Sequence, residues 1–288
     1  MTLPLPPGAR VPDKLAWVNG ALVRGEEAVL SLWDRGARDG GAIFETVRVY
    51  DGRPFAWERH LERLVLSAAE LGFPVPPSPS RLRKAMGELL GAQSLTDAVV
   101  RITVTRGIAG GRPTRTGAWI EAESVPARLW SGQRTASASA ILSAHPFAAG
   151  WLGRHKTTSR MAWDLAREEA RAAGVDETVL VSPEGMVLEG AASNLFVVSS
   201  GEVLTPPIAL DVLPGVARAV TLGLCAELGI PAREAAIPLT LLQAADEVFL
   251  TNSVQEVLPV GVLAGRALPT REVGLRLRDA YRALTAQP

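Results

Sequence analysis

Residues 188–196, LEGAASNLF, and residues 213–218, LPGVAR, constrain the fold more than any other part of the sequence. In the first segment a glutamate ends one apolar run, small residues follow it, and a second apolar run begins after them. This pattern predicts a hairpin whose strands are joined by a small-residue bend. The small residues beside the Glu189 carboxylate leave room for a flat ring, although the same pattern also fits an ordinary hairpin glutamate in solvent.

The second segment places proline and glycine at the start of a helix that we predict over residues 214–228. The unpaired N–H groups in the first turn of a helix can hold a phosphate. Proline and glycine also occur at helix starts for capping reasons alone. The segment therefore indicates a phosphate site only in combination with other features.

Lysine is rare in this chain. Of the thirty basic residues only Lys14, Lys84 and Lys156 are lysine. A lysine, unlike an arginine, can lose its proton and attack a carbonyl carbon. Lys156 follows Arg154 and His155, and this cationic setting suits an amine that must lose a proton. A biased composition that leaves a few lysines by chance would account for the same count.

The first 125 residues predict an α+β layer. The dipeptides Asn19-Gly20 and Asp51-Gly52 are hairpin turn signals, and apolar residues at helical spacing indicate two helices. The predicted elements are, in order, hairpins within residues 17–23 and 43–57, helices over 58–71 and 80–90, and strands over 99–105 and 118–123.

The rest of the chain predicts a second domain in which strands alternate with short turns, a pattern typical of a partly closed barrel. Its predicted elements are a strand over residues 136–143, a helix over 161–173, two hairpins within 178–205, helices over 214–228 and 239–245, a buried strand over 247–251, and a helix from 270. Residues 126–133 are irregular. We therefore predict domains at 1–125 and 134–288 with 126–133 as the linker.

Composition excludes several classes of protein. The 288 residues are 47% hydrophobic and 21% charged, and thirty acidic residues balance thirty basic ones, so no large basic face for nucleic acid is expected. One cysteine and three histidines cannot form a disulfide framework or a zinc cluster. No run fits a membrane span, and the N-terminus has no signal-peptide pattern, so we expect a cytoplasmic protein that acts on small molecules.

Together these motifs resemble the class IV (fold type IV) pyridoxal-phosphate aminotransferase family, over about residues 17–260. The resemblance is carried without a gap from Glu189 through Asn194 to the helix start at 213–218. The other matching segments are DRG at 34–36, FETVR at 44–48, HLERL at 60–64 and TNS at 251–253. The resemblance implies a two-domain fold like that of D-amino acid aminotransferase, with a small N-terminal α/β sandwich and a larger barrel-like C-terminal domain.

The resemblance also implies the cofactor and its ligands. Pyridoxal 5'-phosphate would form a Schiff base with Lys156, which then moves the proton, and a carboxylate at Glu189 would keep the pyridine nitrogen charged. The other cofactor-binding residues that it implies are Arg63, Asn194, Val216, Ala217 and Ser253. Relatives often have threonine where this chain has Ala217, so a hydroxyl contact is missing there and Ser253 would compensate. The resemblance further implies a homodimer in which the N-terminal domain of one subunit closes the pocket of the other.

The reaction is the least constrained expectation, because the family includes branched-chain transaminases, D-amino acid transaminases and 4-amino-4-deoxychorismate lyases. A glycine-rich segment with Arg106 and Arg112 suits a doubly anionic substrate and resembles the lyases. Glu256, by contrast, is similar to the transaminases. Phe44 stands where relatives often have tyrosine, and only two tyrosines occur in the chain, so a tyrosine-lined branched-chain pocket is not expected.

On balance the sequence favours the lyase, which expels pyruvate and leaves 4-aminobenzoate, with a transaminase as the alternative. The predicted substrate-binding residues are Phe44, Arg106, Arg112 and Val254. Other enzyme classes fit poorly, because the chain has neither the glycine fingerprint of a Rossmann dehydrogenase nor the G-x-S-x-G elbow of a serine hydrolase. A non-catalytic binding protein would be expected to have lost Lys156, Glu189 or Arg63, and all three are present.

Overall fold

The computed structural model describes residues 12–74, 76–110, 116–125 and 137–287, and in it the chain divides into two units. Unit 1 consists of Met1–Val125 and Lys156–Ser159, and unit 2 of Pro126–His155 and Arg160–Pro288. Each unit has its own sheet, so the predicted mixed α and β class is confirmed. The predicted linker, 126–133, lies outside the described residues.

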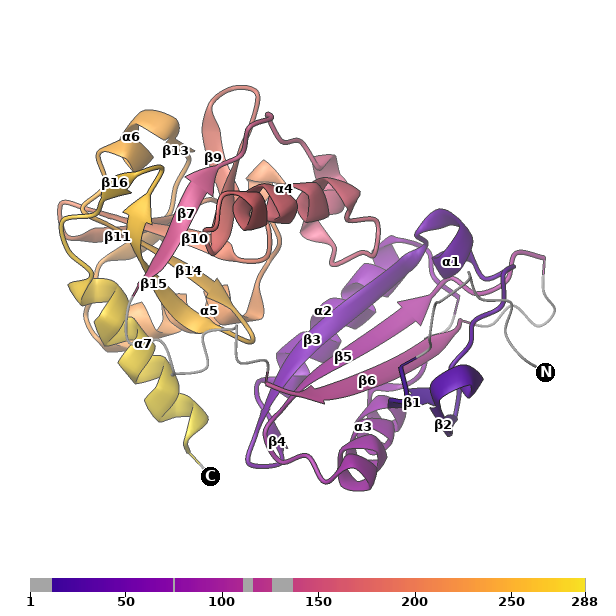
Figure 1. Cartoon of the computed structure of the whole chain (residues 1–288). Coiled ribbons are helices and arrows are strands. Elements are labelled where there is room, and N and C mark those ends of the chain that lie inside the picture. Colours follow the sequence, from indigo (N-terminus) through magenta and orange to yellow (C-terminus); the bar gives the residue numbers. More distant parts are fainter. Residues whose placement is uncertain (1–11, 75, 111–115, 126–136, 288) are drawn as a thin grey trace. The chain divides into compact units, whose positions relative to one another are not determined.

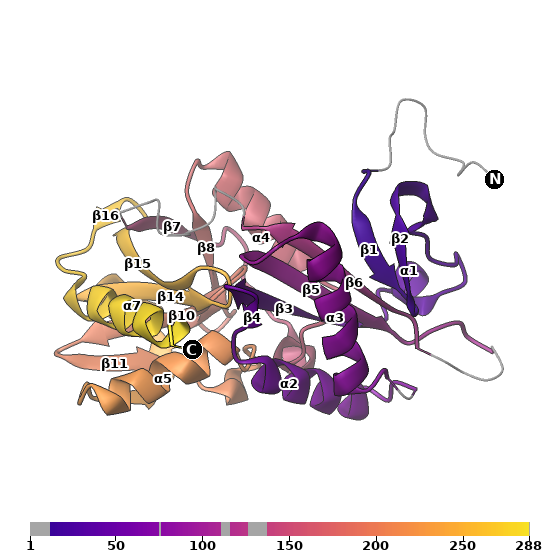
Figure 2. The ribbon, with the colours of Figure 1, turned by 90° about the horizontal axis from the view of Figure 1, so that it is seen from below.

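Unit 1 is a six-stranded sheet in the order β2-β1-β6-β5-β3-β4. Its elements are β1 (Leu15–Val18), β2 (Ala21–Arg24), α1 (Arg35–Asp39), β3 (Ala42–Tyr50), β4 (Arg53–Pro54), α2 (Trp57–Glu70), α3 (Pro79–Gln93), β5 (Ala98–Thr105) and β6 (Ala118–Ser124). Both hairpin turns form as predicted, because Asn19, Gly20, Asp51 and Gly52 all have positive φ. Helices α2 and α3 cover one face of the sheet (Figure 1 and Figure 2) and bury a core of aliphatic strand and helix residues.

Residues 156–158 form an additional edge of the unit 1 sheet. The Phe44 N–H donates to the Lys156 carbonyl at 2.8 Å, and the Thr158 N–H donates to the Ala42 carbonyl at 2.9 Å. Ile43 and Thr157 form an antiparallel bridge between them. Since β5 pairs with β3 over this same stretch, the returning chain occupies the other edge of β3. The sequence did not predict this pairing.

Unit 2 is built on a ten-stranded sheet with the order β12-β11-β10-β14-β15-β7-β8-β9-β13, and β16 pairs with β15. Its strands are β7 (Ala138–Leu142), β8 (Glu177–Val181), β9 (Met186–Gly190), β10 (Asn194–Ser199), β11 (Glu202–Thr205), β12 (Ala232–Glu234), β13 (Ile237–Pro238), β14 (Glu247–Asn252), β15 (Glu256–Leu263) and β16 (Arg266–Ala267). Its helices are α4 (Met161–Ala172), α5 (Val216–Glu227), α6 (Leu239–Gln243) and α7 (Glu272–Thr285).

The predicted strands and helices of this half are present within a few residues of their expected bounds, but β12, β13, β15 and β16 were not predicted. The omission of β15 matters most, because this strand pairs with β14 on one side and with β7 on the other. Helix α4 packs on β8, and α5 and α7 pack against each other and on β14 and β15. No helix among the described residues is long and apolar enough to cross a membrane.

Candidate active site

Of the three lysines, only Lys156 is partly buried. Lys14 and Lys84 form surface ion pairs, with side chains 68% and 80% exposed. The Lys156 backbone is fixed on the edge of β3, and its Nζ lies 4.8 Å from the centre of the Phe44 ring. Phe44 is itself buried, and the Arg101 guanidinium covers its ring at 3.6 Å. The Phe44 ring therefore lies between the Lys156 amine and the Arg101 guanidinium as their common aromatic neighbour.

Glu45 forms a buried charged cluster with two residues of α2. Because neighbouring residues of a strand point to opposite faces, Glu45 faces α2 while Phe44 faces away from it. Arg63 donates Nε to one carboxylate oxygen at 2.8 Å and Nη2 to the other at 2.6 Å, and His60 Nδ1 lies 2.7 Å from the same second oxygen. Burial would raise the pKa of the Glu45 carboxyl, but the charge of Arg63 and the hydrogen bonds from His60 and Arg63 lower it to about 2.

The sequence named Arg63 as a phosphate ligand and gave Glu45 and His60 no role. In the structure two nitrogens of the Arg63 guanidinium bind Glu45, so its role toward a phosphate remains a prediction. Burial lowers the pKa of the His60 imidazole, against the raising effect of Glu45. The helical spacing could have revealed this cluster, because His60 lies beside the core residue Leu61 on the buried face of α2.

Glu189 lies at the end of β9 and is buried, which excludes the solvent-exposed hairpin glutamate that its sequence pattern also allowed. One carboxylate oxygen accepts from the Trp163 indole at 3.2 Å. The other accepts from the Leu213 N–H at 3.0 Å and the Asn194 amide at 3.4 Å. Asn194 also donates to the Leu213 carbonyl at 2.9 Å. These contacts bring Glu189 and Asn194 together with the segment that starts α5.

The first turn of α5 has no side-chain cap. Gly215 is the residue before the helix, and Val216 and Ala217 belong to the first turn. A Cβ on Gly215 would lie only 1.9 Å from the Asn194 Oδ1, so this close approach requires glycine. The Thr251 hydroxyl, which lies opposite Asn194 in the sheet, is buried and has no hydrogen-bond partner among the described residues. An uncapped helix start and an unsatisfied buried hydroxyl fit an anionic group such as a phosphate.

Glu177 stabilises the bend between Glu189 and Asn194. Its carboxylate accepts hydrogen bonds from the Ser193 hydroxyl at 2.8 Å, the Thr178 N–H at 3.0 Å and the Ala192 N–H at 3.3 Å. Burial raises the pKa of this carboxyl. The sequence did not single out Glu177, and its contacts with the bend span fifteen or more residues.

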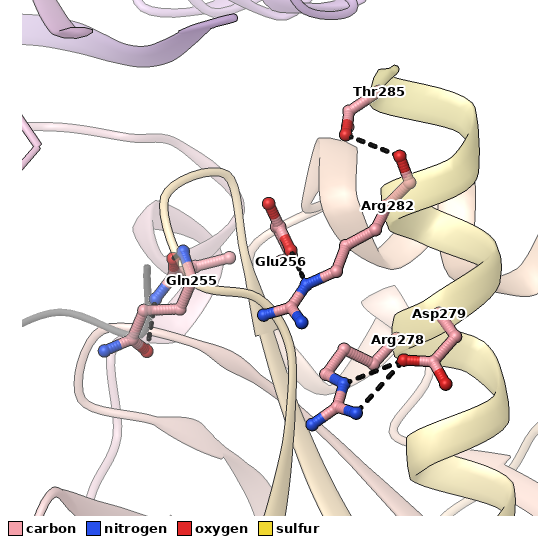
Figure 3. Close-up of polar contacts among 7 residues, drawn as sticks. Gln255, Glu256, Arg278, Asp279, Arg282 and Thr285 are labelled. Carbon is pink, nitrogen blue, oxygen red and sulfur yellow. Dashed lines mark hydrogen bonds and ion pairs between the residues drawn. The ribbon is translucent and has the colours of Figure 1, made fainter. Parts of the chain in front are cut away.

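Ser253 and Val254 lie in the turn between β14 and β15. The Asn252 Oδ1 accepts from the N–H groups of Val254 at 3.0 Å and Gln255 at 2.7 Å, which fixes the turn. Glu256 follows it with φ of 62°, a left-handed conformation that is unusual for a residue with a side chain. The buried Glu256 carboxylate accepts from Arg282 Nε at 3.1 Å, so helix α7 anchors the turn (Figure 3).

Of the two arginines expected to bind substrate, Arg106 lies against the end of α2. Its guanidinium donates to the Gly72 carbonyl at 3.4 Å and lies 5.9 Å from the centre of the Phe73 ring. Its Nε is buried without a partner among the described residues. Arg112 lies outside the described residues. Of the two arginines, only Arg106 lies among the described residues, and it already has local contacts.

Comparison with known proteins gives consistent matches over most of the chain. The family model described as amino-transferase class IV matches residues 42–263. A putative branched-chain-amino-acid aminotransferase of Methanocaldococcus jannaschii is 32% identical, over 90% of this chain and 91% of its own. A D-alanine aminotransferase of Bacillus licheniformis is 29% identical, over 92% of this chain and 94% of its own. The PLP-bound form of a hypothetical aminotransferase from Mycobacterium tuberculosis superposes with a TM-score of 0.83 at 27% identity, over 93% of this chain and 98% of its own.

Proposed function

This chain belongs to the class IV amino-transferase family, and we propose that it is an amino acid transaminase that uses pyridoxal 5'-phosphate and a 2-oxo acid acceptor. The observation that carries the proposal is the match, over about nine-tenths of the chain, to relatives named as branched-chain and D-alanine aminotransferases. They support the transaminase better than the lyase that the sequence favoured. The sequence feature that favoured the lyase was a pair of arginines for a doubly anionic substrate. That feature is weakened, because Arg106 already contacts Gly72 and Phe73 at the end of α2.

The residues described above fit this cofactor. When bound, pyridoxal 5'-phosphate supplies an electrophilic carbon for amines and a ring that withdraws electrons from the substrate α-carbon. Glu189 places a negative charge where a pyridine nitrogen would keep its proton, and Asn194 holds that carboxylate in position. The N–H groups of Val216 and Ala217 and the Thr251 hydroxyl are suited to the phosphate.

Lys156 performs the proton transfer in this proposal. The Lys156 amine would hold the cofactor, and with a substrate present the same amine would act as the base that takes the α-proton and gives it back. The aromatic ring of Phe44, beside the Lys156 amine, would give the substrate side chain an apolar neighbour. We therefore expect apolar α-amino acids among the substrates, with Val254 as a further substrate contact, and Ser253 stays a predicted contact of the cofactor. The homodimer implied by the resemblance stays a prediction that light scattering can test.

A single set of assays tests the proposal. The purified enzyme, loaded with cofactor, is incubated with a panel of L- and D-amino acids and 2-oxoglutarate, and the glutamate formed is measured with its configuration. In parallel it receives aminodeoxychorismate alone. We expect glutamate from apolar amino acids and no pyruvate from aminodeoxychorismate. Pyruvate release without an acceptor, together with no glutamate, would overturn the transaminase in favour of the lyase.

A further inference from the structure

Arg160 connects the start of α4 to the bend beside Glu189. It is the residue that precedes α4, and its guanidinium Nη2 donates to the Ala191 carbonyl at 2.9 Å. This hydrogen bond fixes the guanidinium in position. Its central carbon lies 4.9 Å from the centre of the Trp163 ring, within the range of a cation–π contact.

Trp163 transmits this contact to the carboxylate. The indole is buried, and the Phe147 ring meets it edge to face at 4.8 Å. Its Nε1–H donates to Glu189 at 3.2 Å. A cation near the face of an indole withdraws electron density from the ring and makes the indole N–H a stronger donor. The guanidinium therefore both restrains the ring and strengthens the hydrogen bond that orients Glu189.

The charges around Arg160 are compatible with this role. Burial lowers the pKa of its guanidinium, whereas the carboxylates of Glu189, Asp164 and Glu177 raise it and Arg167 lowers it further. A guanidinium keeps its proton in proteins even when buried. Arg160 is thus a permanent cation within the electrostatic reach of Glu189.

We propose that Arg160 is a positioning residue that acts on Glu189 through the Trp163 indole. The inference rests on the proposed function, because it assigns Arg160 to the control of the carboxylate that would face the cofactor ring. Arg160 makes no chemical step itself. Its effect is to hold Glu189 in one orientation and to support the charge of that carboxylate.

The first test needs no turnover. The indole N–H of Trp163 is followed by NMR in the full-length protein, with and without pyridoxal 5'-phosphate, and its resonance is assigned with Trp163→Phe. We expect Arg160→Met to speed hydrogen exchange at this N–H about tenfold, as loss of one desolvated cation–π contact implies. Arg171→Met, on the exposed face of the same helix, is the matched control and should leave the exchange rate unchanged. An indole N–H that is insensitive to Arg160→Met would overturn the proposal.

The second test is a double-mutant cycle on the loaded enzyme. We expect Arg160→Met and Trp163→Phe each to lower kcat about tenfold with KM changed less than about threefold, because a displaced Glu189 affects the chemical step. If Arg160 acts through Trp163, the double variant resembles the more affected single variant. A loss of about a hundredfold, the product of the two, would contradict the coupling.

Two further outcomes are separated by this design. Should Arg160→Met fail to fold, Arg160→Gln carries the same test with the same expected result, because it removes the charge and keeps an N–H donor for the Ala191 carbonyl. If the unmodified protein forms no glutamate, the proposed function fails, while the NMR result on the protein without cofactor still decides the Arg160 inference.

Discussion

Glu45 in unit 1 and Glu189 in unit 2 are both buried, and the structure satisfies them in opposite ways. Glu45 is surrounded by cationic or ionisable donors, the Arg63 guanidinium and the His60 imidazole, so its charge is balanced inside the protein. Glu189 is held by a different kind of donor, because an indole, a backbone N–H and an amide, all uncharged, donate to its carboxylate. Neutral dipoles orient a carboxylate without neutralising it, so its charge can act on a bound group.

The comparison teaches that burial alone does not distinguish a structural carboxylate from a functional one. A bidentate pair with arginine makes Glu45 part of the scaffold that fixes β3 to α2. The N–H of Leu213, just before α5, instead ties Glu189 to the segment where we propose that the cofactor binds.

Loss of the Lys156 amine should have the largest effect on turnover. Lys156→Ala is expected to lower kcat on the order of 10⁴-fold or more, because it removes the nucleophile and proton carrier. The melting temperature should stay nearly unchanged, since the strand that carries Lys156 pairs through its backbone. Lys84→Ala, on the exposed surface of α3, is the control. Borohydride labelling at Lys14 or Lys84 instead of Lys156 would contradict the assignment.

Exchange of each glutamate for glutamine should separate the two regions. Glu45→Gln leaves the Arg63 cation buried without its anion and should lower the free energy of unfolding by about 3–5 kcal/mol. Glu189→Gln should unfold at nearly the same denaturant concentration and lower kcat about 10²–10³-fold, because it removes a preorganised charge. Chemical denaturation and steady-state kinetics on both variants check this. Equal stability losses in the two variants would break the distinction between them.

Acid should weaken unit 1 specifically. The pKa of Glu45 is about 2 in the folded protein against an ordinary 4.5, so its contribution is complete above pH 4.5 and is lost as the pH falls toward 2. At about 1.4 kcal/mol per pKa unit this contribution is about 3 kcal/mol. The lowered pKa of His60 acts in the same direction, starting from a higher pH.

The contribution of Glu177 in unit 2 to stability changes with pH in the opposite direction. Because its pKa is raised in the folded protein, its contribution is present at low pH and is lost as the pH rises above the ordinary value. Hydrogen exchange measured by mass spectrometry between about pH 7 and pH 3 should therefore show protection falling earlier in unit 1 than in unit 2. The variant Glu45→Gln should remove much of this difference, and a simultaneous loss in both units would argue against it.

The smallest effect concerns the turn that carries Ser253 and Val254. Arg282→Met removes one partner of the buried Glu256 carboxylate and should cost about 1–2 kcal/mol of stability. It also removes one contact between Glu256 and helix α7, so KM for the amino acid should rise about twofold to threefold. Arg278→Met, one turn earlier on α7 and paired with Asp279, is the matched control (Figure 3). Identical kinetics for both variants would remove α7 from any role at the turn.

Local signals in the sequence predicted much of the fold. Asn19-Gly20 and Asp51-Gly52 determine their hairpins through the backbone conformation of two residues each, and helical spacing located α2 within one residue. Strand β15 was missed because Pro259 lies inside it, and proline is rare in central strands. Strand β15 pairs with β7 through Val260 and the residues after it. Pro259, which has no backbone N–H, is not part of that pairing.

The candidate site was less accessible to sequence reasoning, because its decisive contacts are non-local. Residue type and local setting singled out Lys156 and Glu189, and the family resemblance added Asn194, but neither indicated the partners that define their environments. Trp163 reaches Glu189 from 26 residues away, and Arg63 reaches Glu45 from 18 residues away, by way of a strand and a helix. A pattern of residue types indicates which side chains could have a chemical role. The packing of separate elements decides which of them is paired with an opposite charge, as Glu45 is with Arg63.

The pairing of residues 156–158 with β3 has a consequence for synthesis of the chain. Unit 1 is not continuous in the sequence, because Lys156–Ser159 joins it only after a part of unit 2 has been made. On the ribosome, the edge of β3 therefore has no partner from this segment until synthesis has passed residue 159. An unpaired strand edge is a site of aggregation. A pause in translation before residue 159 should therefore favour aggregation of the nascent chain. Once residues 156–158 have left the ribosome they can pair with the edge of β3, and the same pairing fixes the backbone of Lys156.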